Sequence, residues 1–172
     1  NIMNKAVGEI RNRVSGIATD INVAKITMMH VKDRPGIAAN LFEALAKVGI
    51  SVDVIVQNAS VGGSTDLTFT VHRTDLTQAE SVVEKVAADL ETGKIVTSSD
   101  LAKISIVGTG MQNAPGYAST MFRTLADHHI NIEMITTSEI RITCLVKETQ
   151  IAQAARALHT AFDLDTDSSR FD

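Results

Sequence analysis

Hydrophobic positions along this chain follow two spacings, which predict an alternation of strands and helices. Segments 24–31 and 102–108 are apolar and rich in β-branched residues, as buried strands are. Segment 37–48 repeats apolar residues every three or four positions, which predicts a helix with one buried face. The residues of that face are Ile37, Leu41, Ala44, Leu45 and Val48. Gly49 follows at the position where a left-handed residue commonly ends a helix.

Segment 52–57 alternates as a strand does when one of its faces lies in the core. The first side carries Val52, Val54 and Val56, and the second carries Asp53, Ile55 and Gln57. Gly62-Gly63 predicts a hairpin turn into another strand over 66–71. A helix over 78–90 and a short strand over 94–97 complete the order strand–helix–strand–strand–helix–strand.

The same pattern then recurs. Residues 35–55 align without a gap with residues 115–135, and both stretches open with Pro-Gly. Upstream, Ala24-Lys25-Ile26 recurs as Ala102-Lys103-Ile104, with two extra residues in the loop of the second copy. A match of this length indicates an internal duplication.

The second copy predicts the same elements with one exception. Strands are expected over 132–137 and 140–146, with a tight turn near Ser138-Glu139 between them, and a closing helix over 149–162. The buried face of its first helix is expected to comprise Tyr117, Met121, Leu125 and His128. After Phe162 the chain is acidic and polar, which is a poor strand sequence. We therefore expect segment 14–18 to pair with the second copy's sheet, so that the two domains interlock.

Together these elements predict an α+β fold. It consists of two tandem ferredoxin-like βαββαβ units, with helices on one face of antiparallel sheets. We assign residues 20–98 to the first domain, and residues 99–163 with strand 14–18 to the second. Residues 164–172 form a polar tail.

Composition narrows the class of protein. The net charge of -4 over 172 residues argues against a nucleic-acid binder, which normally carries a basic stripe. No apolar run approaches the roughly 20 residues that span a membrane, and residues 1–13 lack the apolar segment of a secretory signal. The single cysteine, Cys144, has apolar neighbours, which predicts a buried thiol. A lone thiol suits the reducing cytoplasm.

The loop before each predicted helix has groups suited to a free amino acid. The first turn of a helix offers unpaired N–H groups and a positive dipole end, which suit an α-carboxylate. Gly36 and Gly116 remove a side chain where a ligand would approach the backbone, and Pro35 and Pro115 stiffen the loop. Asp33 can pair with an α-ammonium group.

Two amides follow the neighbouring strand. Gln57 and Asn58 can both donate and accept hydrogen bonds, which fits a small polar side chain such as that of threonine. Asp-x-Pro-Gly is also an ordinary turn sequence. Its recurrence as Pro-Gly at the equivalent place in the second copy favours a ligand loop.

Several phrases in the chain resemble a known family. They are Asp33-Arg34-Pro35-Gly36-Ile37-Ala38, Val56-Gln57-Asn58, Asp66-Leu67-Thr68-Phe69-Thr70, Val107-Gly108-Thr109-Gly110-Met111 and Thr137-Ser138-Glu139-Ile140-Arg141-Ile142. The layout resembles the ACT domain, an amino-acid-sensing module, and the phrases resemble the regulatory region of aspartate kinases over roughly residues 14–163. The resemblance leaves open whether the chain is a separately translated β subunit or a C-terminal fragment.

The resemblance implies a homodimer in which the first copy of one chain meets the second copy of its partner, with an effector between them. Carried over, one effector site comprises Asp33, Arg34, Pro35, Gly36, Ile37, Ala38, Gln57 and Asn58, completed by Asn131 and Ile132. A second comprises Asn113, Ala114, Pro115, Gly116, Tyr117 and Ala118, with Ser138, Glu139, Ser51, Val52 and Asp53.

The second site departs from the first because it has no aspartate at the position of Asp33 and its loop is longer. Two interpretations stay open. The site takes another effector such as lysine, with Glu139 or Asp53 facing the extra ammonium, or it only holds the dimer together.

The function that the resemblance implies is feedback inhibition of an aspartate kinase by threonine and/or lysine. The catalytic domain or α subunit, with its ATP and magnesium, would be a separate part, and no cofactor or metal is expected in this chain. Two alternatives stay open. One is a small hydrolase of acylphosphatase type that uses Arg34 and Asn58. The other is an ACT regulator of another amino-acid pathway.

Two further motifs predict no chemistry. Gly108-x-Gly110 follows a strand but lacks the third glycine of a dinucleotide loop. His128 and His129 are adjacent, so they would point about 100° apart on a helix, and no further ligand lies at metal-binding spacing. They are expected at an exposed helix end.

Overall fold

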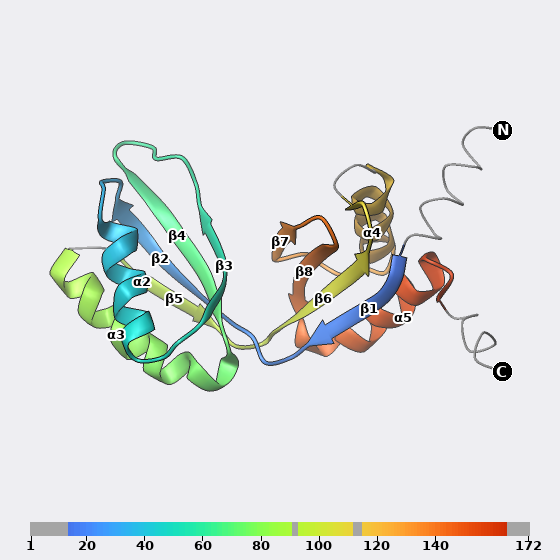
Figure 1. The fold of residues 1–172 in the computed structure, drawn as a ribbon, viewed down its shortest axis with the longest axis horizontal. Coiled ribbons are helices and arrows are strands. Elements are labelled where there is room, and N and C mark those ends of the chain that lie inside the picture. The colour runs from blue at the N-terminus through green and yellow to red at the C-terminus, as the bar shows by residue number, and fades with distance from the viewer. Residues whose placement is uncertain (1–13, 91–92, 112–114, 165–172) are drawn as a thin grey trace. The chain divides into compact units, whose positions relative to one another are not determined.

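The computed structural model describes residues 14–90, 93–111 and 115–164, which form two compact units (Figure 1). We call the unit of residues 22–101 the first domain. The second domain is the unit of residues up to 21 together with those from 102 onward. The second domain is therefore discontinuous in sequence, and the whole first domain is inserted within it.

The first domain is a four-stranded antiparallel sheet with two helices on one face (Figure 1). Its elements are β2 (Ala24–Lys32), α2 (Ile37–Lys47), β3 (Val52–Gln57), β4 (Ser64–Val71), the short 3-10 turn η1 (Arg73–Asp75), α3 (Leu76–Leu90) and β5 (Ile95–Ser98). The strand order is β3-β4-β2-β5. This is the βαββαβ arrangement that the hydrophobic pattern predicts.

One apolar layer lies between this sheet and its helices. Ile26 and Phe69 on the strands and Leu41 and Leu45 on α2 are fully buried in it. The alternation predicted for β3 is present, since Val54 is buried while Ile55 on the other side is 53% exposed. Burial of this layer is the main favourable contribution to the folding of the domain.

The second domain repeats this plan. Its elements are β1 (Val14–Asp20), β6 (Leu101–Gly108), α4 (Gly116–Asp127), β7 (Met134–Thr137), β8 (Arg141–Lys147), the 3-10 turn η3 (Glu148–Gln150) and α5 (Ile151–Ala161). The strand order is β1-β6-β8-β7. The core again lies between the sheet and the helix faces, with Ile104, Met121, Leu125 and Leu158 fully buried.

Strand β1 takes the place in the second sheet that β5 holds in the first. It pairs antiparallel with β6, with Ile17 opposite Ile106 and Asp20 opposite Lys103. The predicted pairing of segment 14–18 with the second copy's sheet is confirmed, and the strand runs two residues further than predicted. Without β1, the N–H and C=O groups along one edge of β6 would have no strand to pair with.

Both first helices end in the same left-handed motif, but with different residues. In the first domain Gly49, with φ 78°, and Ile50 donate their N–H groups to the carbonyls of Ala46 and Leu45, at 3.0 and 3.1 Å. This is the helix ending predicted for Gly49. In the second domain His129 takes the equivalent position with φ 58°, and the equivalent two hydrogen bonds measure 3.0 and 2.9 Å.

One expectation for the helix faces is wrong. The spacing predicts His128 on the buried face of α4, but this residue is exposed, and Val48 at the equivalent place on α2 is 42% exposed. Both residues are helix C-caps, where the backbone already departs from helical geometry. The backbone leaves the helical path there, so the three-to-four spacing no longer determines burial.

The second core extends to both ends of the described chain. Cys144 on β8 is fully buried, as predicted, and burial raises the pKa of its thiol to about 12. Leu164, which the sequence pattern assigns to the polar tail, packs against this core. The rest of the tail, residues 165–172, lies outside the described residues.

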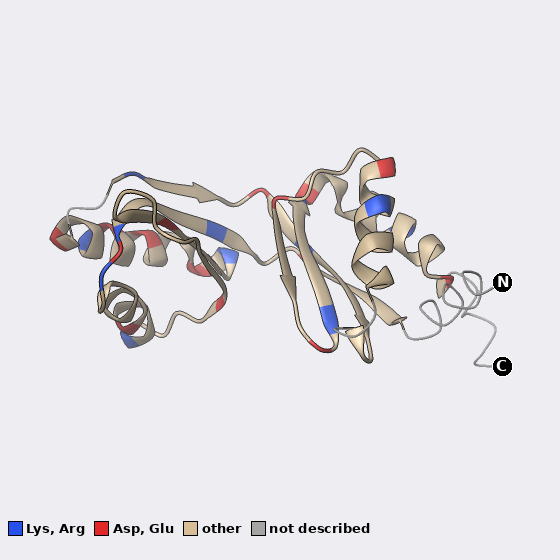
Figure 2. Ribbon diagram, turned by 90° about the horizontal axis from the view of Figure 1, so that it is seen from above, with Lys and Arg blue, Asp and Glu red and all other residues tan. Residues whose placement is uncertain are grey.

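Charges of both signs are scattered over each domain, and neither sign gathers into a stripe (Figure 2). Among the described residues, no helix combines the length and the apolar character that a membrane crossing needs.

Substituting His129→Gly should stabilise the second domain by about 1 kcal/mol, because glycine adopts a positive φ without the steric cost that a Cβ imposes. The reverse change, Gly49→His, should destabilise the first domain by a similar amount. Chemical denaturation of both variants checks this, and a loss of stability in His129→Gly would contradict it.

Cys144 should make the protein sensitive to alkali. Its folded pKa, about 12, exceeds its ordinary value of 9.0, so the stabilisation is fully present below pH 9 and is lost as pH rises toward 12. Relative to Cys144→Ala, the wild type should lose about 1.4 kcal/mol of unfolding free energy per pH unit in that window. Denaturation at a series of pH values measures both slopes, and equal slopes would contradict the assignment.

Candidate functional site

The candidate site begins with an irregularity in the central strand β2. His30 has φ 57°, and the register with β4 shifts between Met28 and Val31. The backbone N–H of His30 donates to Oδ1 of Asp66 at 3.1 Å, so a side chain on β4 satisfies a group that the bulge removes from the ladder. Bulges bend a strand and redirect the loop after it. The hydrophobic pattern does not predict this bulge, whose only signal in the sequence is an aspartate within a predicted strand.

The loop after β2 is tied to the glycine hairpin. The N–H of Asp33 donates to the carbonyl of Gly63 at 3.0 Å, and the N–H of Arg34 donates to the carbonyl of Lys32 at 3.1 Å. The other end of the hairpin is held by Thr65, whose hydroxyl donates to the carbonyl of Asn58 at 2.8 Å. The loop therefore has a defined position against β3 and β4.

Gly36 is the N-cap of α2, and its backbone is left-handed with φ 93°. An added Cβ would meet nothing within 4 Å, so the requirement for glycine here is conformational and not one of space. No side chain caps the helix. The N–H groups of Ile37, Ala38 and Ala39 lie in the first turn, where a helix provides no backbone acceptor. These groups are available to an anion.

A cavity of about 360 Å³ lies at this helix start. Its lining residues are Val31, Lys32, Asp33, Arg34, Pro35, Gly36, Ile37, Ala38, Gln57 and Leu67. The structure thus brings the six loop residues predicted from the sequence together with Gln57 around one space. Lys32 also lines it and was not predicted. The volume of this cavity lies within the range of small-molecule sites.

The lining of this cavity combines groups of both charges. Lys32 and Arg34 are cationic, Asp33 is anionic, and Gln57 contributes an amide. The helix start adds N–H donors and the positive end of the α2 dipole. A ligand with both a carboxylate and an ammonium group would find partners for each here.

Three predicted residues lie elsewhere. Asn58 does not line the cavity and contributes its carbonyl to the hairpin. Arg34 and Asn58, the pair proposed for a hydrolase, therefore do not meet at this space. Asn131 and Ile132 belong to the second domain, where Asn131 donates from Nδ2 to Oε1 of Glu133 at 3.3 Å and Ile132 packs against the core.

The second loop enters its helix differently. Pro115 is the N-cap of α4 with φ -62°, and Gly116 is the first helical residue, not a left-handed cap. The N–H of Met111 donates to the carbonyl of Glu139 at 3.0 Å, so the β7–β8 turn contacts this loop. Asn113 and Ala114 lie outside the described residues.

The remaining residues predicted for the second site are spread over both domains. Tyr117 is fully buried, and its hydroxyl has no hydrogen-bond partner among the described residues, whereas Ala118 is half-buried. Ser138 is exposed and its N–H donates to the carbonyl of Arg141 at 2.8 Å. Residues 51–53, which are Ser51, Val52 and Asp53, lie in the first domain at the start of β3.

No group of three or more His, Cys, Asp or Glu side chains in the described ranges is arranged to hold a metal ion. His128 and His129 both lie exposed at the end of α4, where an adjacent pair of histidines is expected.

Comparison with known proteins defines the class of both domains. A family described as "ACT domain" matches residues 29–86 and 104–162. One match lies in the first domain and the other in the second, and together they cover more than half of the chain. The protein is therefore built from two ACT domains.

Individual relatives narrow the family. The chain is 45% identical over 152 residues to an aspartate kinase of Pseudomonas putida and 40% identical over 153 residues to an aspartokinase of Corynebacterium glutamicum. It spans only 37% and 36% of their lengths. The solved regulatory subunit of aspartate kinase from Thermus thermophilus is 38% identical with a TM-score of 0.83, covering 87% of this chain and 99% of that one.

A chain in a structure of aspartokinase alpha and beta subunits gives a similar result, with 41% identity and a TM-score of 0.81. The match covers 87% of this chain and 99% of that one. The chain belongs to the ACT-domain family of aspartate kinase regulatory regions.

The conformation of Gly36 makes a direct prediction. Gly36→Ala should cost about 1 kcal/mol of stability, because alanine disfavours φ 93°, and should disturb the cavity. Gly116→Ala is the matched control, since Gly116 is helical and alanine favours a helix. Denaturation measures both, and equal effects of the two changes would contradict the conformational argument.

Proposed function

We propose that this chain is the effector-sensing region of an aspartate kinase, in which a free amino acid binds the cavity at the start of α2 and inhibits an associated catalytic domain. Threonine is the proposed ligand of this cavity. The observation that carries the proposal is the convergence of the loop residues 33–38 and Gln57 on one space that holds both charges. The family to which the chain belongs supports the link to aspartate kinase.

In the proposed complex, each part of threonine has a partner. The α-carboxylate accepts from the first-turn N–H groups of α2 and from the Arg34 guanidinium. The α-ammonium pairs with the Asp33 carboxylate. The Gln57 amide, at the end of β3, serves the ligand hydroxyl as donor or acceptor.

Inhibition needs only a modest difference in affinity between two states. A ligand that binds one arrangement more tightly by about 1–3 kcal/mol shifts an equilibrium roughly 5- to 150-fold. We propose that the ligand favours the inhibited arrangement of a homodimer formed through the ACT domains. Such a ligand also stabilises the assembly by mass action.

The catalytic part is a further proposed partner. The solved structure of aspartokinase alpha and beta subunits, to which this chain is similar, supports an association with either a catalytic domain or an α subunit. ATP and magnesium would belong to that partner.

We propose that the second loop has a different role: it either binds lysine or only holds the dimer together. Gly116 is helical here and Asp33 has no acidic counterpart in the aligned sequence, so this loop lacks two features of the first. Glu139, whose carbonyl contacts the loop, is the proposed partner of a lysine side chain.

Asp33→Asn and Gln57→Ala should each weaken threonine binding about 10- to 100-fold, since the first removes the charge that faces the ammonium group and the second removes the amide that serves the hydroxyl. Isothermal titration of the folded chain with threonine, with lysine, and with each in the presence of the other measures the effect. Asp89→Asn, an exposed change on α3, serves as the matched control.

Saturable threonine binding that both site variants weaken and the control retains is the expected result. Unchanged affinity in both variants would refute the site. Heat from lysine alone, at a site that Asp33→Asn leaves intact, would assign the effector to the second loop.

A further inference from the structure

A second cavity, separate from both loops, lies between the two helices of the second domain. It has a volume of about 400 Å³. Thr124, Asp127 and His128 of α4 line one wall, and Gln153, Arg156 and Thr160 of α5 line the other, with Ala157 and Ala161 between them. We call it the helix groove. None of its residues belongs to the effector sites of the two loops.

The groove exists where two side chains are small. Because η3 and α5 repeat η1 and α3 residue by residue, Ala157 and Ala161 take the positions of Val82 and Val86. In the first domain these valines are partly buried and pack against the core. The two alanines leave that volume open in the second domain. Arg156 takes the position of Ser81, so a cation stands where the duplicate has a hydroxyl.

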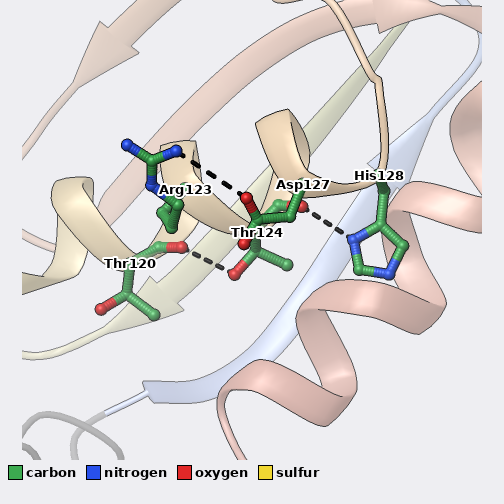
Figure 3. A network of polar contacts seen from close by, with 5 residues as sticks. All are labelled: Thr120, Arg123, Thr124, Asp127 and His128. Carbon is green, nitrogen blue, oxygen red and sulfur yellow. Dashed lines mark hydrogen bonds and ion pairs between the residues drawn. The ribbon is translucent and has the colours of Figure 1, made fainter.

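The wall formed by α4 presents hydrogen-bond acceptors, because its protons are used within the helix (Figure 3). The Thr124 hydroxyl donates to the carbonyl of Thr120 at 2.7 Å. Nδ1 of His128 lies 2.8 Å from the carbonyl of Thr124, and since a carbonyl only accepts, Nδ1 carries the proton. In the neutral ring Nε2 is therefore an acceptor. The Asp127 carboxylate, 3.8 Å from the Arg123 guanidinium, adds the third acceptor.

The wall formed by α5 presents donors. Arg156 offers a guanidinium, which can bind a carboxylate through two parallel hydrogen bonds, and Gln153 offers an amide N–H. Neither side chain has a hydrogen-bond or ion-pair partner within the part of the chain that the structure describes. The floor of Ala157 and Ala161 is apolar. The acceptors thus lie on α4, and the cationic donor of the groove, Arg156, lies on α5.

We propose that the helix groove binds a zwitterionic amino acid, at a site distinct from the cavity at the start of α2. Its ammonium group faces Asp127, the Thr124 hydroxyl oxygen and Nε2 of His128. Its carboxylate faces Arg156 and Gln153, and its aliphatic part lies on the two alanines. A simple anion would engage only the donors of α5 and a simple cation only the acceptors of α4, whereas a ligand with both groups engages both walls at once.

Backbone amide shifts in ¹H–¹⁵N spectra of the full chain test this. The titrants are glycine, the other common α-amino acids and 4-aminobutyrate, added one at a time. Propionate and ethylamine, which each carry only one of the two charged groups, are the controls. We expect saturable shifts in residues 124–128 and 153–161 with at least one zwitterion. Propionate and ethylamine should bind at least tenfold more weakly.

Two variants locate the site. Arg156→Gln should weaken the binding of that zwitterion about tenfold or more, because it removes the charge that faces the carboxylate. The double change Ala157→Val with Ala161→Val restores the residues of the first domain and should abolish binding by filling the groove. Ser81→Ala, at the position of Arg156 in the first domain, is the matched control and should have no effect.

Either of two results overturns the proposal. One is the absence of groove shifts with every zwitterion, and the other is equal affinity for propionate or ethylamine. Gln57→Ala distinguishes the groove from the proposed effector site. It should leave binding in the groove intact while it weakens threonine binding in the cavity at the start of α2. Loss of groove shifts in Gln57→Ala would mean that the two observations report a single site.

Discussion

The strand that leads into the first helix of each domain is hydrogen-bonded to a strand on both of its sides, and the rest of each domain depends on this constraint. β2 lies between β4 and β5, and β6 lies between β8 and β1. A strand held on both edges cannot shift its register easily, so the loop after it keeps a fixed place against the start of the helix. The second domain meets the constraint only by taking β1 from the far side of the first domain in the sequence.

Given similar scaffolds, the two loops differ in the conformation of their glycines and in the residues that follow. Gly36 adopts a left-handed conformation that opens the first turn of α2 toward a cavity with charges of both signs. In the second domain Gly116 is helical, and Tyr117 buries its ring where the first domain has Ile37. The packing is alike in the two copies, while the residues of the two loops differ. The helix groove reflects the same principle, since two alanines in place of valines open a space that the other copy fills.

The sequence predicted the fold because burial enforces its two periodicities. The apolar spacing and the alignment of the repeats predict the buried faces of α2 and α4. The acidic, polar sequence after Phe162 predicts the pairing of β1. Other features depend on the backbone and have little signal in the pattern. The only signal of the bulge at His30 is the position of Asp66, and Lys32, which follows the bulge along β2, lines the cavity. Exposure of His128 results from the end of its helix, which hydrophobic spacing does not locate to a single residue.

The most direct test of the account is amide hydrogen exchange in the first turn of α2, with and without threonine. The account predicts that the N–H groups of Ile37, Ala38 and Ala39 become protected as threonine saturates the chain, because they donate to its carboxylate. The equivalent amides at the start of α4 should change less. Threonine binding that leaves the exchange of those three amides unchanged would contradict the account, since it would place the ligand away from the helix start.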